Sequence, residues 1–401
     1  MNKFNKKGTD AEELTYQLVT SSYLSHWTFI NPIDVDGDKN EICDIIILFD
    51  GHLFLISVKN YAFKGNYDKF FRKVIAKSSR QLHGAERKIN RKESIVLIHE
   101  ERGVVKINRQ EISDIYLITV FHNDDLDYYP ILDFRRDKKP ISIFPQSYFE
   151  KIVSEFDTTS DLTDYLVKRN SLLTGNESLS LNGNELDLVA IYLTRAREFP
   201  KDFFQQADHI IMDISGEWDR YDQDEKTRLK RLASKPSYFI DWLVDEFILK
   251  NHTNPANHKL AEVLLNLDRL MRRVITETLF ELIEKYKKEK EFIARRFFSI
   301  DDNYYALIFV SDDILNPEFA EWLCETFAVG THIYLAEKEL SNHIVIVTNH
   351  KIHPVYYSYW GIGEKLEDLY LNEIEMRCSK FGFFQNLEGF KKHYSEYPGD
   401  T

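Results

Sequence analysis

Two apolar segments joined by an Asp-Gly dipeptide constrain the fold of this chain more than any other feature of its sequence. The run from Ile42 to Phe49 is mostly apolar and β-branched, and a second such run extends from His52 to Lys59. Asp50-Gly51 between them is favoured in tight hairpin turns, because both central positions of such a turn need positive φ. The sequence therefore predicts an antiparallel β-hairpin that folds back at residues 50 and 51.

Three polar side chains interrupt this apolar pattern and are expected to lie together. Side chains alternate between the two faces of a strand, so Ser57 and Lys59 share one face near the end of the second strand. In a hairpin folded at residues 50 and 51, Asp44 lies opposite position 57. A carboxylate and an ammonium then meet beside an apolar sheet, which makes a candidate site. The alternative is a buried salt bridge that only fixes the geometry of the sheet.

Further patterns on either side of the hairpin predict the rest of an α/β domain. Residues 9–12 read as a capping box that opens a helix ending near Leu24. Apolar spacing over residues 67–89 predicts a second, long helix, and the apolar runs 95–98 and 115–120 predict buried strands. These strands would complete a mixed sheet flanked by the two helices. The polar residues expected largely off the buried stripe of the long helix are Ser78, Arg80, Gln81 and Arg87.

The order of these features resembles the PD-(D/E)xK nuclease superfamily, in particular its Mrr-like and nuclease-related (NERD-like) branches. The family pattern has Gly-x-x-x-Glu at the start of a helix, Asp opening one strand, (Asp/Glu)-x-Lys on the next, and Gln on the following helix. The matching positions here are Gly8 to Glu12, Asp44, Ser57-Val58-Lys59 and Gln81. The resemblance covers residues 1–125. Ser57 departs from the pattern, since Asp or Glu is usual there, although the Mrr-like branch often has Gln.

This resemblance implies a restriction-endonuclease-like domain that uses Mg²⁺ or Mn²⁺. By the same resemblance, the metal ligands would be Asp44, a second carboxylate from Glu12 or Glu41, and the carbonyl oxygen of Val58. Glu41 lies three residues before Asp44 and would supply the carboxylate that Ser57 does not. Magnesium keeps several waters in protein sites, so a short ligand set is tolerable. For Glu12 the alternative is that it only returns the hydrogen bond of the helix cap.

The implied catalytic set is Asp44, Lys59, Glu12, Gln81 and Ser57. Lys59 would stabilise charge that develops on the phosphate or orient the attacking water. Gln81 would hold that water or a phosphate oxygen, and the alternative for it is an ordinary surface glutamine. Ser57 offers only a hydroxyl group, directly or through water.

The distribution of charge points to a phosphate-binding surface, although the whole chain carries a net charge of −13. Residues 59–109 contain fourteen basic and five acidic residues. Such asymmetry is typical of a local nucleic-acid-binding surface on an otherwise acidic protein. The alternative is a solvated helix face that binds nothing. The residues expected to contact the nucleic acid backbone are Lys64, Lys69, Arg72, Lys73, Lys77 and Arg80.

Length and composition indicate a multidomain protein of the cytoplasm. A chain of 401 residues exceeds one ordinary core, and its hydrophobic and charged fractions, 43% and 29%, are those of a soluble globular protein. No apolar run reaches the length of a membrane span, and the N-terminal residues do not form a secretory signal. Cys43, Cys324 and Cys378 are widely separated, which favours neither a disulfide framework nor a zinc site.

The rest of the chain is expected to form connecting, helical and C-terminal parts. We expect a nuclease domain at 1–125, connecting helices and a linker at 126–180, a helical domain at 181–299, and a small α/β domain at 300–401. Within the last part, residues 304–310, 332–336 and 343–348 are expected strands and 317–328 a helix. The aromatic-rich tail suits a packed surface or an interface with a protein partner or a second copy.

The function implied by the resemblance is hydrolysis of phosphodiester bonds in double-stranded DNA, in restriction or anti-phage defence. No base-reading motif is present, so sequence specificity is not predicted. The alternatives are a degenerate nuclease-like module that binds nucleic acid or a partner without cleavage, and an RNase. The C-terminal parts would sense a trigger or bind a partner.

Overall fold

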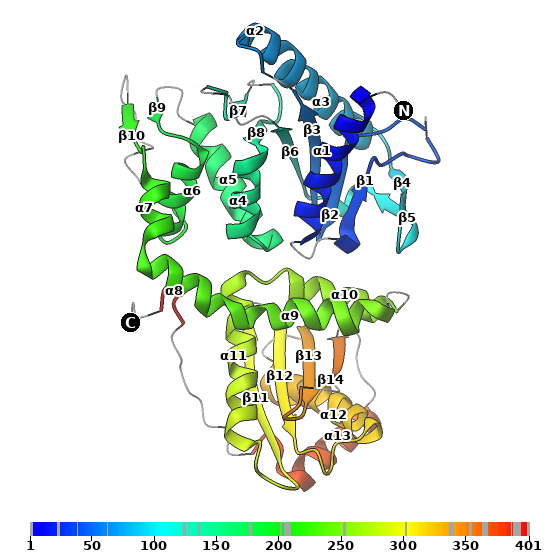
Figure 1. Cartoon of the computed structure of the whole chain (residues 1–401). Coiled ribbons are helices and arrows are strands. Elements are labelled where there is room, and N and C mark those ends of the chain that lie inside the picture. The colour runs from blue at the N-terminus through cyan, green and yellow to red at the C-terminus, as the bar shows by residue number, and fades with distance from the viewer. Residues whose placement is uncertain are drawn as a thin grey trace. The chain divides into compact units, whose positions relative to one another are not determined.

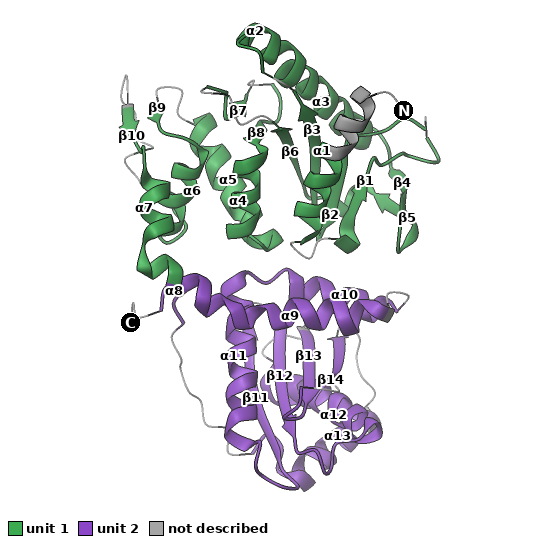
Figure 2. Cartoon of the chain, viewed as in Figure 1, with its two compact units in different colours: residues 1–228 green, residues 229–401 purple. Residues whose placement is uncertain are grey.

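The structure is a computed structural model, and it divides the chain into two compact units, residues 1–228 and 229–401 (Figure 2). Figure 1 labels the helices and strands. The structure describes residues 3–21, 25–37, 39–61, 63–122, 126, 128–134, 137–175, 179–200, 203, 210–251, 254–300, 303–336, 341–352, 355–362, 368–385, 387 and 394–398. The boundary between the units falls near 228, whereas domain boundaries were expected near 125, 180 and 300.

A six-stranded mixed sheet forms the centre of the first unit, in the order β1-β2-β3-β6-β8-β7. The pairs β1/β2, β2/β3 and β7/β8 are antiparallel, whereas β3/β6 and β6/β8 are parallel. The chain is therefore a mixed α/β protein, as predicted. The strands are β1 (Thr28–Ile30), β2 (Ile45–Phe49), β3 (His52–Asn60), β6 (Asp114–His122), β7 (Leu132–Asp133) and β8 (Ile141–Pro145).

The predicted hairpin is confirmed in its turn and in its register. Asp50 and Gly51 have φ of 45° and 80°, which is the left-handed conformation that a tight hairpin turn requires. A side chain at position 51 would also approach the hydroxyl oxygen of Ser113 to 2.8 Å, so a larger residue there would force the Ser113 side chain to move. Ile45 pairs with Ile56, which places residue 44 opposite residue 57 as expected.

Helices cover both faces of the sheet, and the alternation of side chains along β3 decides which residues each helix contacts. Leu53 and Leu55 pack in one cluster with Leu82 of α3 (Ala76–Asn90). Phe54 and Ile56 point to the other face, where they line a small gap with Val19 of α1 (Lys3–Val19) and Phe149 of α4 (Gln146–Glu155). The helix after β3 therefore packs on the face opposite to α1.

The long helix predicted over residues 67–89 consists of three consecutive segments. It begins as α2 (Tyr67–Phe70), passes through a π-helical turn (Phe71–Ile75) and continues as α3. A π turn holds one more residue than an α turn, so it shifts the phase of the side chains that follow. Ser78 and Ser79 are both buried after this turn. The prediction that Ser78 lies off the buried stripe is therefore wrong.

Two further expectations about the N-terminal region are wrong. The first helix begins at Lys3, so Thr9 lies inside α1 and does not cap it; the helix ends at Val19, and Leu24, its expected end, lies outside the described residues. The apolar run 95–98 belongs to β4 (Ser94–His99), which pairs with β5 (Gly103–Asn108) in a separate two-stranded sheet. A short apolar run does not specify its partner strand, which is why the sequence assigned this one to the main sheet.

Helices and one small parallel pair of strands follow the sheet in the first unit. The helices are α4, α5 (Thr159–Gly175), α6 (Glu185–Thr194) and α7 (Glu217–Gln223), and the strands are β9 (Leu179–Asn182) and β10 (Ile210–Asp213). Arg169 of α5 and Glu185 of α6 form a fully buried ion pair, with Nε to Oε1 at 2.6 Å and Nη2 to Oε2 at 2.7 Å. Tyr165 also donates to Glu185 Oε1 at 2.5 Å.

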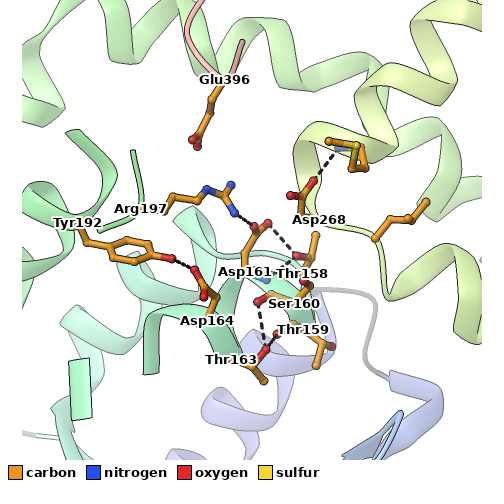
Figure 3. Close-up of polar contacts among 12 residues, drawn as sticks. Thr158, Thr159, Ser160, Asp161, Thr163, Asp164, Tyr192, Arg197, Asp268 and Glu396 are labelled. Carbon is orange, nitrogen blue, oxygen red and sulfur yellow. Dashed lines mark hydrogen bonds and ion pairs between the residues drawn. The ribbon is translucent and has the colours of Figure 1, made fainter. Parts of the chain in front are cut away.

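The start of α5 is fixed by its own polar side chains (Figure 3). The hydroxyl of Thr158 accepts the backbone N–H of Asp161 at 3.1 Å and donates to its carboxylate at 2.7 Å. Arg197 forms an ion pair with the same carboxylate, and Tyr192 donates to Asp164. These contacts supply an acceptor for one N–H group in the first turn of α5 and hold that turn against α6 and the segment that follows α6.

The second unit contains a helical part followed by a four-stranded sheet in the order β11-β12-β13-β14. Its elements are α9 (Tyr238–Leu243), α10 (Pro255–Leu265), α11 (Arg269–Tyr286), β11 (Ile293–Ile300), β12 (Asn303–Val310), α12 (Pro317–Leu335), β13 (Ser341–Thr348), β14 (Val355–Ile362) and α13 (Asp368–Phe381); α8 (Glu225–Ser234) contains the boundary between the units. Residues 332–335, expected in a strand, are the last turn of α12. No helix in the described parts of the chain is both long and apolar enough to cross a membrane.

Candidate functional site

Asp44, Ser57 and Lys59 are brought together at the open end of the hairpin, as the sequence predicted. Asp44 Oδ2 accepts hydrogen bonds from the Ser57 hydroxyl at 3.0 Å and from Lys59 Nζ at 3.3 Å. Lys59 Nζ also lies 2.6 Å from the Ser57 hydroxyl oxygen and 3.0 Å from the carbonyl oxygen of Val58. The side chains of Asp44 and Lys59 retain 9% and 12% of their exposure, so the pair borders on solvent.

This arrangement arises because β2 is shorter than β3. Strand pairing between them ends at Ile45 and Ile56, so the backbone of β3 continues without this partner from residue 57 onward. The carboxylate of Asp44 replaces the missing partner, because it accepts the backbone N–H of Val58. A buried backbone N–H needs an acceptor, and here a side chain supplies it.

Two further carboxylates belong to the same electrostatic site. Burial raises the pKa of Glu41, and the charge of Asp44, the charge of Glu12 and a carboxyl–carboxyl hydrogen bond with Asp44 raise it further, while Lys59 lowers it. Burial also raises the pKa of Glu12, and Asp44 adds to that rise. Glu12, Glu41 and Lys59 therefore gather around Asp44. The burial of both residues is only partial, since Glu41 and, to a lesser extent, Glu12 keep part of their surface exposed, so the site is open to solvent.

Asn31 joins the site, and the sequence analysis missed it. Its side chain hydrogen-bonds to Glu12 and lowers the pKa of that carboxyl. Its backbone N–H donates to the carbonyl oxygen of Asp44 at 2.8 Å, and its φ is 44°. Asparagine tolerates this left-handed conformation better than most residues. An Asn directly after a short strand was the available signal, but the sequence does not show that β1 lies beside β2.

Gln81 lies apart from these contacts. It is exposed on α3, and none of the hydrogen bonds among Asp44, Ser57 and Lys59 involves it. Ser78, one turn earlier, faces the sheet instead, with its hydroxyl oxygen 2.5 Å from that of Thr119. Thr119 is the strand partner of Ser57. The side of α3 that carries Ser78 thus packs next to the site, and the role expected for Gln81 stays a prediction.

A second polar group lies where the parallel strands end. His122 is the last residue of β6, and Gln146 follows the last residue of β8. Thr15 of α1 links them, with its hydroxyl oxygen 3.2 Å from His122 Nε2 and 3.1 Å from Gln146 Oε1. Lys59 and His122 therefore mark the carboxyl ends of neighbouring parallel strands, which is where open α/β sheets commonly bind ligands. Sequence spacing alone did not reveal this group.

The six residues expected to bind nucleic acid are all exposed: Lys64, Lys69, Arg72, Lys73, Lys77 and Arg80. Five of them lie on the helix formed by α2, the π turn and α3. Arg72 and Arg80 donate through Nε to backbone carbonyl oxygens at 3.4 and 3.2 Å. Within the part of the chain that the structure describes, no ion pair joins any of the six to an acidic side chain. We call this set the cationic row.

The donor set at Asp44 suits a hard divalent cation, although its side chains are not arranged as a complete metal cage. Carboxylate and carbonyl oxygens are the ligands that Mg²⁺ prefers, and one or two carboxylates with several waters are enough for it. Among the described residues, no three His, Cys, Asp or Glu side chains meet in an arrangement that could hold a metal ion. The neighbouring pair Asp44 and Glu41 is therefore the part of the expected ligand set that fits best.

Comparisons of this chain with protein-family models, with curated proteins and with solved structures found no match.

Proposed function

We propose that the first unit is a metal-dependent endonuclease that hydrolyses phosphodiester bonds in DNA, with a restriction-endonuclease-like fold. The observation that carries this proposal is the gathering of Glu12, Glu41 and Lys59 around Asp44 at the carboxyl end of β3. Three carboxyl groups beside the single ammonium of Lys59 give this partly buried site an excess of negative charge. Such an excess is electrostatically unfavourable, and a bound divalent cation would compensate for it.

In this proposal Asp44 and Glu41 hold Mg²⁺ or Mn²⁺, with Glu12 and the carbonyl oxygen of Val58 as further ligands. When bound, the ion would supply an activated water molecule and neutralise charge on the phosphate. Lys59 stabilises the charge that develops on the phosphate oxygens. Ser57 acts mainly on Lys59, because its hydroxyl lies 2.6 Å from Nζ and so fixes where the ammonium points.

The proposed substrate is double-stranded DNA, and the support for it is the cationic row on the helix that follows β3. Exposed cations that are not neutralised by acids attract a phosphate backbone, release counterions and make binding strongly dependent on salt. Gln81 is exposed on the same helix and would contact a phosphate oxygen. No element of the site reads base edges, so the proposed cleavage does not depend on sequence.

The proposed setting is restriction or anti-phage defence in the cytoplasm. Cys43, Cys324 and Cys378 are free and buried, which suits a reducing compartment. The second unit would respond to a trigger or bind a protein partner or a second copy of the chain. Its separate sheet and core support a role distinct from the chemistry at Asp44.

The rival function is a nucleic-acid-binding module of the same fold that does not cleave. One observation favours it: Asp44 Oδ2 already accepts hydrogen bonds from Ser57, Val58 and Lys59. A carboxylate satisfied in this way has a purely structural explanation, as the acceptor that completes the β3 ladder.

Purified full-length chain with Mg²⁺ or Mn²⁺ should cleave plasmid and linear DNA. Asp44→Asn and Lys59→Ala should each reduce the rate at least about 100-fold, the size typical of losing an electrostatic group in the transition state. Lys250→Ala, which removes an exposed lysine of the second unit, is the matched control. Parallel digestion of single- and double-stranded RNA separates a DNase from an RNase. Intact DNA and RNA under all these conditions would refute cleavage, and metal binding gained in Ser57→Glu without wild-type cleavage would favour the rival.

A further inference from the structure

The second unit contains a cavity of about 680 Å³ that runs along β11, from Phe292 to Ser299. β11 is the first strand in the order of its sheet, and it pairs with β12 alone among the described strands. The outer edge of β11 therefore presents backbone N–H and C=O groups that can form hydrogen bonds with a ligand in the cavity. A volume of this size falls within the range of small-molecule sites.

Two of the described residues that line this cavity are charged, and both are positive. Arg295 and Arg296 belong to the lining, and no described lining residue is acidic. Arg295 Nη2 donates to the carbonyl oxygen of Gly382 at 2.9 Å, and the guanidinium lies 5.7 Å from the centre of the Phe383 ring. Its Nε is buried and has no hydrogen-bond partner. Burial lowers the pKa of Arg295, and no described carboxylate opposes that effect.

A buried donor of this kind needs an acceptor, because an unsatisfied N–H on a charged group costs more than on a neutral one. The described contacts of the Arg295 guanidinium are one hydrogen bond to a carbonyl oxygen and one aromatic ring, and neither supplies a negative charge. An anionic group of a ligand would accept from its guanidinium in the planar geometry that arginine offers to carboxylates and phosphates.

Aromatic rings with fixed orientations form much of the remaining wall. Tyr286 stacks on Phe292 with ring centres 4.8 Å apart, and Phe298 stacks on Tyr305 at 5.2 Å with an interplanar angle of 8°. Tyr304, another lining residue, stacks on His343 at 5.4 Å. Each lining ring is held by a neighbour, so the wall is preorganised for contact with a flat ring.

We propose that this cavity binds a small anionic ligand with an aromatic ring, of the chemical class of nucleotides. The guanidinium of Arg295 contacts the anionic group, the aromatic wall takes the ring, and the outer edge of β11 hydrogen-bonds to the polar edge of the ring. An extended peptide that adds a strand to β11 would engage the guanidinium and the rings only where it carries acidic and aromatic side chains, whereas a nucleotide holds an anion and a ring in one small molecule. This inference is independent of the endonuclease activity proposed for the first unit.

The test is binding of AMP and of ATP to the full-length chain, without metal or nucleic acid, by calorimetry and thermal unfolding. At least one of them should bind and raise the melting temperature of the chain. Adenosine, which lacks the anion, and ribose 5-phosphate, which lacks the ring, should each bind at least about 10-fold more weakly than the nucleotide.

Variants assign the binding to this cavity. Arg295→Gln should weaken nucleotide binding at least about 10-fold, and Arg295→Lys, which keeps the charge, should recover part of it. Lys259→Gln removes a charge from α10 outside the lining and should bind as the wild type does. If Arg295→Gln does not fold, Arg296→Gln, at the other arginine of the lining, replaces it and should also weaken nucleotide binding. Absence of binding by both nucleotides at millimolar concentration, or equal binding by the wild type and the Arg295 and Arg296 variants, would overturn the proposal. Asp44→Asn should bind nucleotide with the affinity of the wild type, because the proposed nuclease site takes no part in this binding. The nucleotide result therefore holds whether or not the chain cleaves DNA.

Discussion

The carboxylate of Asp44 accepts the backbone N–H of Val58 at the point where β2 no longer accompanies β3. The Asp44 side chain thus supplies the hydrogen-bond acceptor for β3 at a position where the backbone of β2 no longer does. The same carboxylate oxygen contacts the Ser57 hydroxyl and the Lys59 ammonium, so one acid determines where both of these groups lie. Among the described contacts, the carboxylate of Glu41 accepts no backbone N–H group. Replacing Glu41 therefore tests metal binding with less risk of disturbing the strand than replacing Asp44 does.

Glu41→Gln should weaken binding of Mn²⁺ to the full-length chain about 10-fold, because it removes one of the two neighbouring carboxylates. Binding by the wild type should also weaken as the pH falls. Burial and the charge of Asp44 raise the pKa of Glu41, so this carboxyl protonates earlier than usual on acidification and then no longer ligates. Calorimetric titration with Mn²⁺ at several pH values measures both effects.

Glu318→Gln, at an exposed acid in the first turn of α12, is the control for that titration. It should leave the affinity for Mn²⁺ unchanged. Equal affinity in the wild type and in Glu41→Gln would remove Glu41 from the metal site.

Lys73→Gln combined with Lys77→Gln should weaken DNA binding about equally for all sequences. Both side chains are exposed, and each phosphate contact that is lost should reduce the slope of log K against log salt by about 0.9. A double variant at Lys285 and Lys288 of the second unit, which removes the same total charge, is the matched control. Fluorescence anisotropy with a labelled duplex between low and moderate salt gives the slopes, and identical slopes for both double variants would argue against the cationic row.

The second unit should lose stability as the pH falls from about 6.5 towards 4. Burial, reinforced by the neighbouring His332, lowers the pKa of His343 to about 4. Between that value and its ordinary pKa, the unfolded chain binds a proton that the folded chain does not, so acid favours unfolding. The loss should be on the order of 2–3 kcal/mol over this window. Hydrogen exchange of β12 and β13 amides at pH 7 and pH 5 reports it.

His343→Phe should flatten this pH dependence, because a phenyl ring keeps the stack on Tyr304 but does not titrate. A wild-type second unit equally stable at pH 7 and pH 5 would contradict the prediction.

Glu185→Gln should destabilise the first unit by about 3–5 kcal/mol, because it leaves the fully buried guanidinium of Arg169 without its counter-charge. Replacing both residues by Met should cost less than the sum of Glu185→Met and Arg169→Met measured separately, because no buried charge then remains. Urea unfolding of the wild type, Glu185→Gln, the two single Met variants and the double Met variant measures these differences. Glu225→Gln breaks an exposed pair with Arg228 and should change nothing measurable. Strict additivity of the two single changes would contradict the expected coupling.

The part of the site that the sequence predicted is the part determined by local rules. Alternation along a strand and the Asp-Gly turn together place Asp44, Ser57 and Lys59, and both rules act within eighteen residues of chain. Glu41 follows from its closeness to Asp44 in the sequence. The mixed sheet, the helical middle and two strands of the C-terminal sheet, β12 and β13, follow from hydrophobic periodicity in the same way. The outer strands β11 and β14 were not predicted, and β11 lies in a region that was expected to be helical.

What the sequence did not predict depends on partners distant in the chain. Asn31 reaches Glu12 only because β1 lies beside β2, and the Thr15 link between His122 and Gln146 joins three separate elements. The strand β4 was assigned to the main sheet because nothing in its apolar run indicates that it pairs with β5. Ser78 was misplaced because its side chain is polar, although it lies four residues after Val74 and four before Leu82 on the buried stripe. Its hydroxyl group meets that of Thr119 in β6, a partner that helical periodicity does not reveal.

The extra residue in the Phe71–Ile75 turn fixes how the buried side of the helix before the turn is aligned with the buried side after it. Shortening the turn by one residue would rotate everything before it by roughly 100° relative to everything after it. Phe70, now fully buried, would swing outward while its charged neighbours turned towards the interior. Substitutions at the exposed Arg72 and Lys73 of this turn should be readily accepted. A single-codon deletion there should instead be among the most damaging changes in the first unit, a contrast that a deletion scan scored by folded yield would reveal.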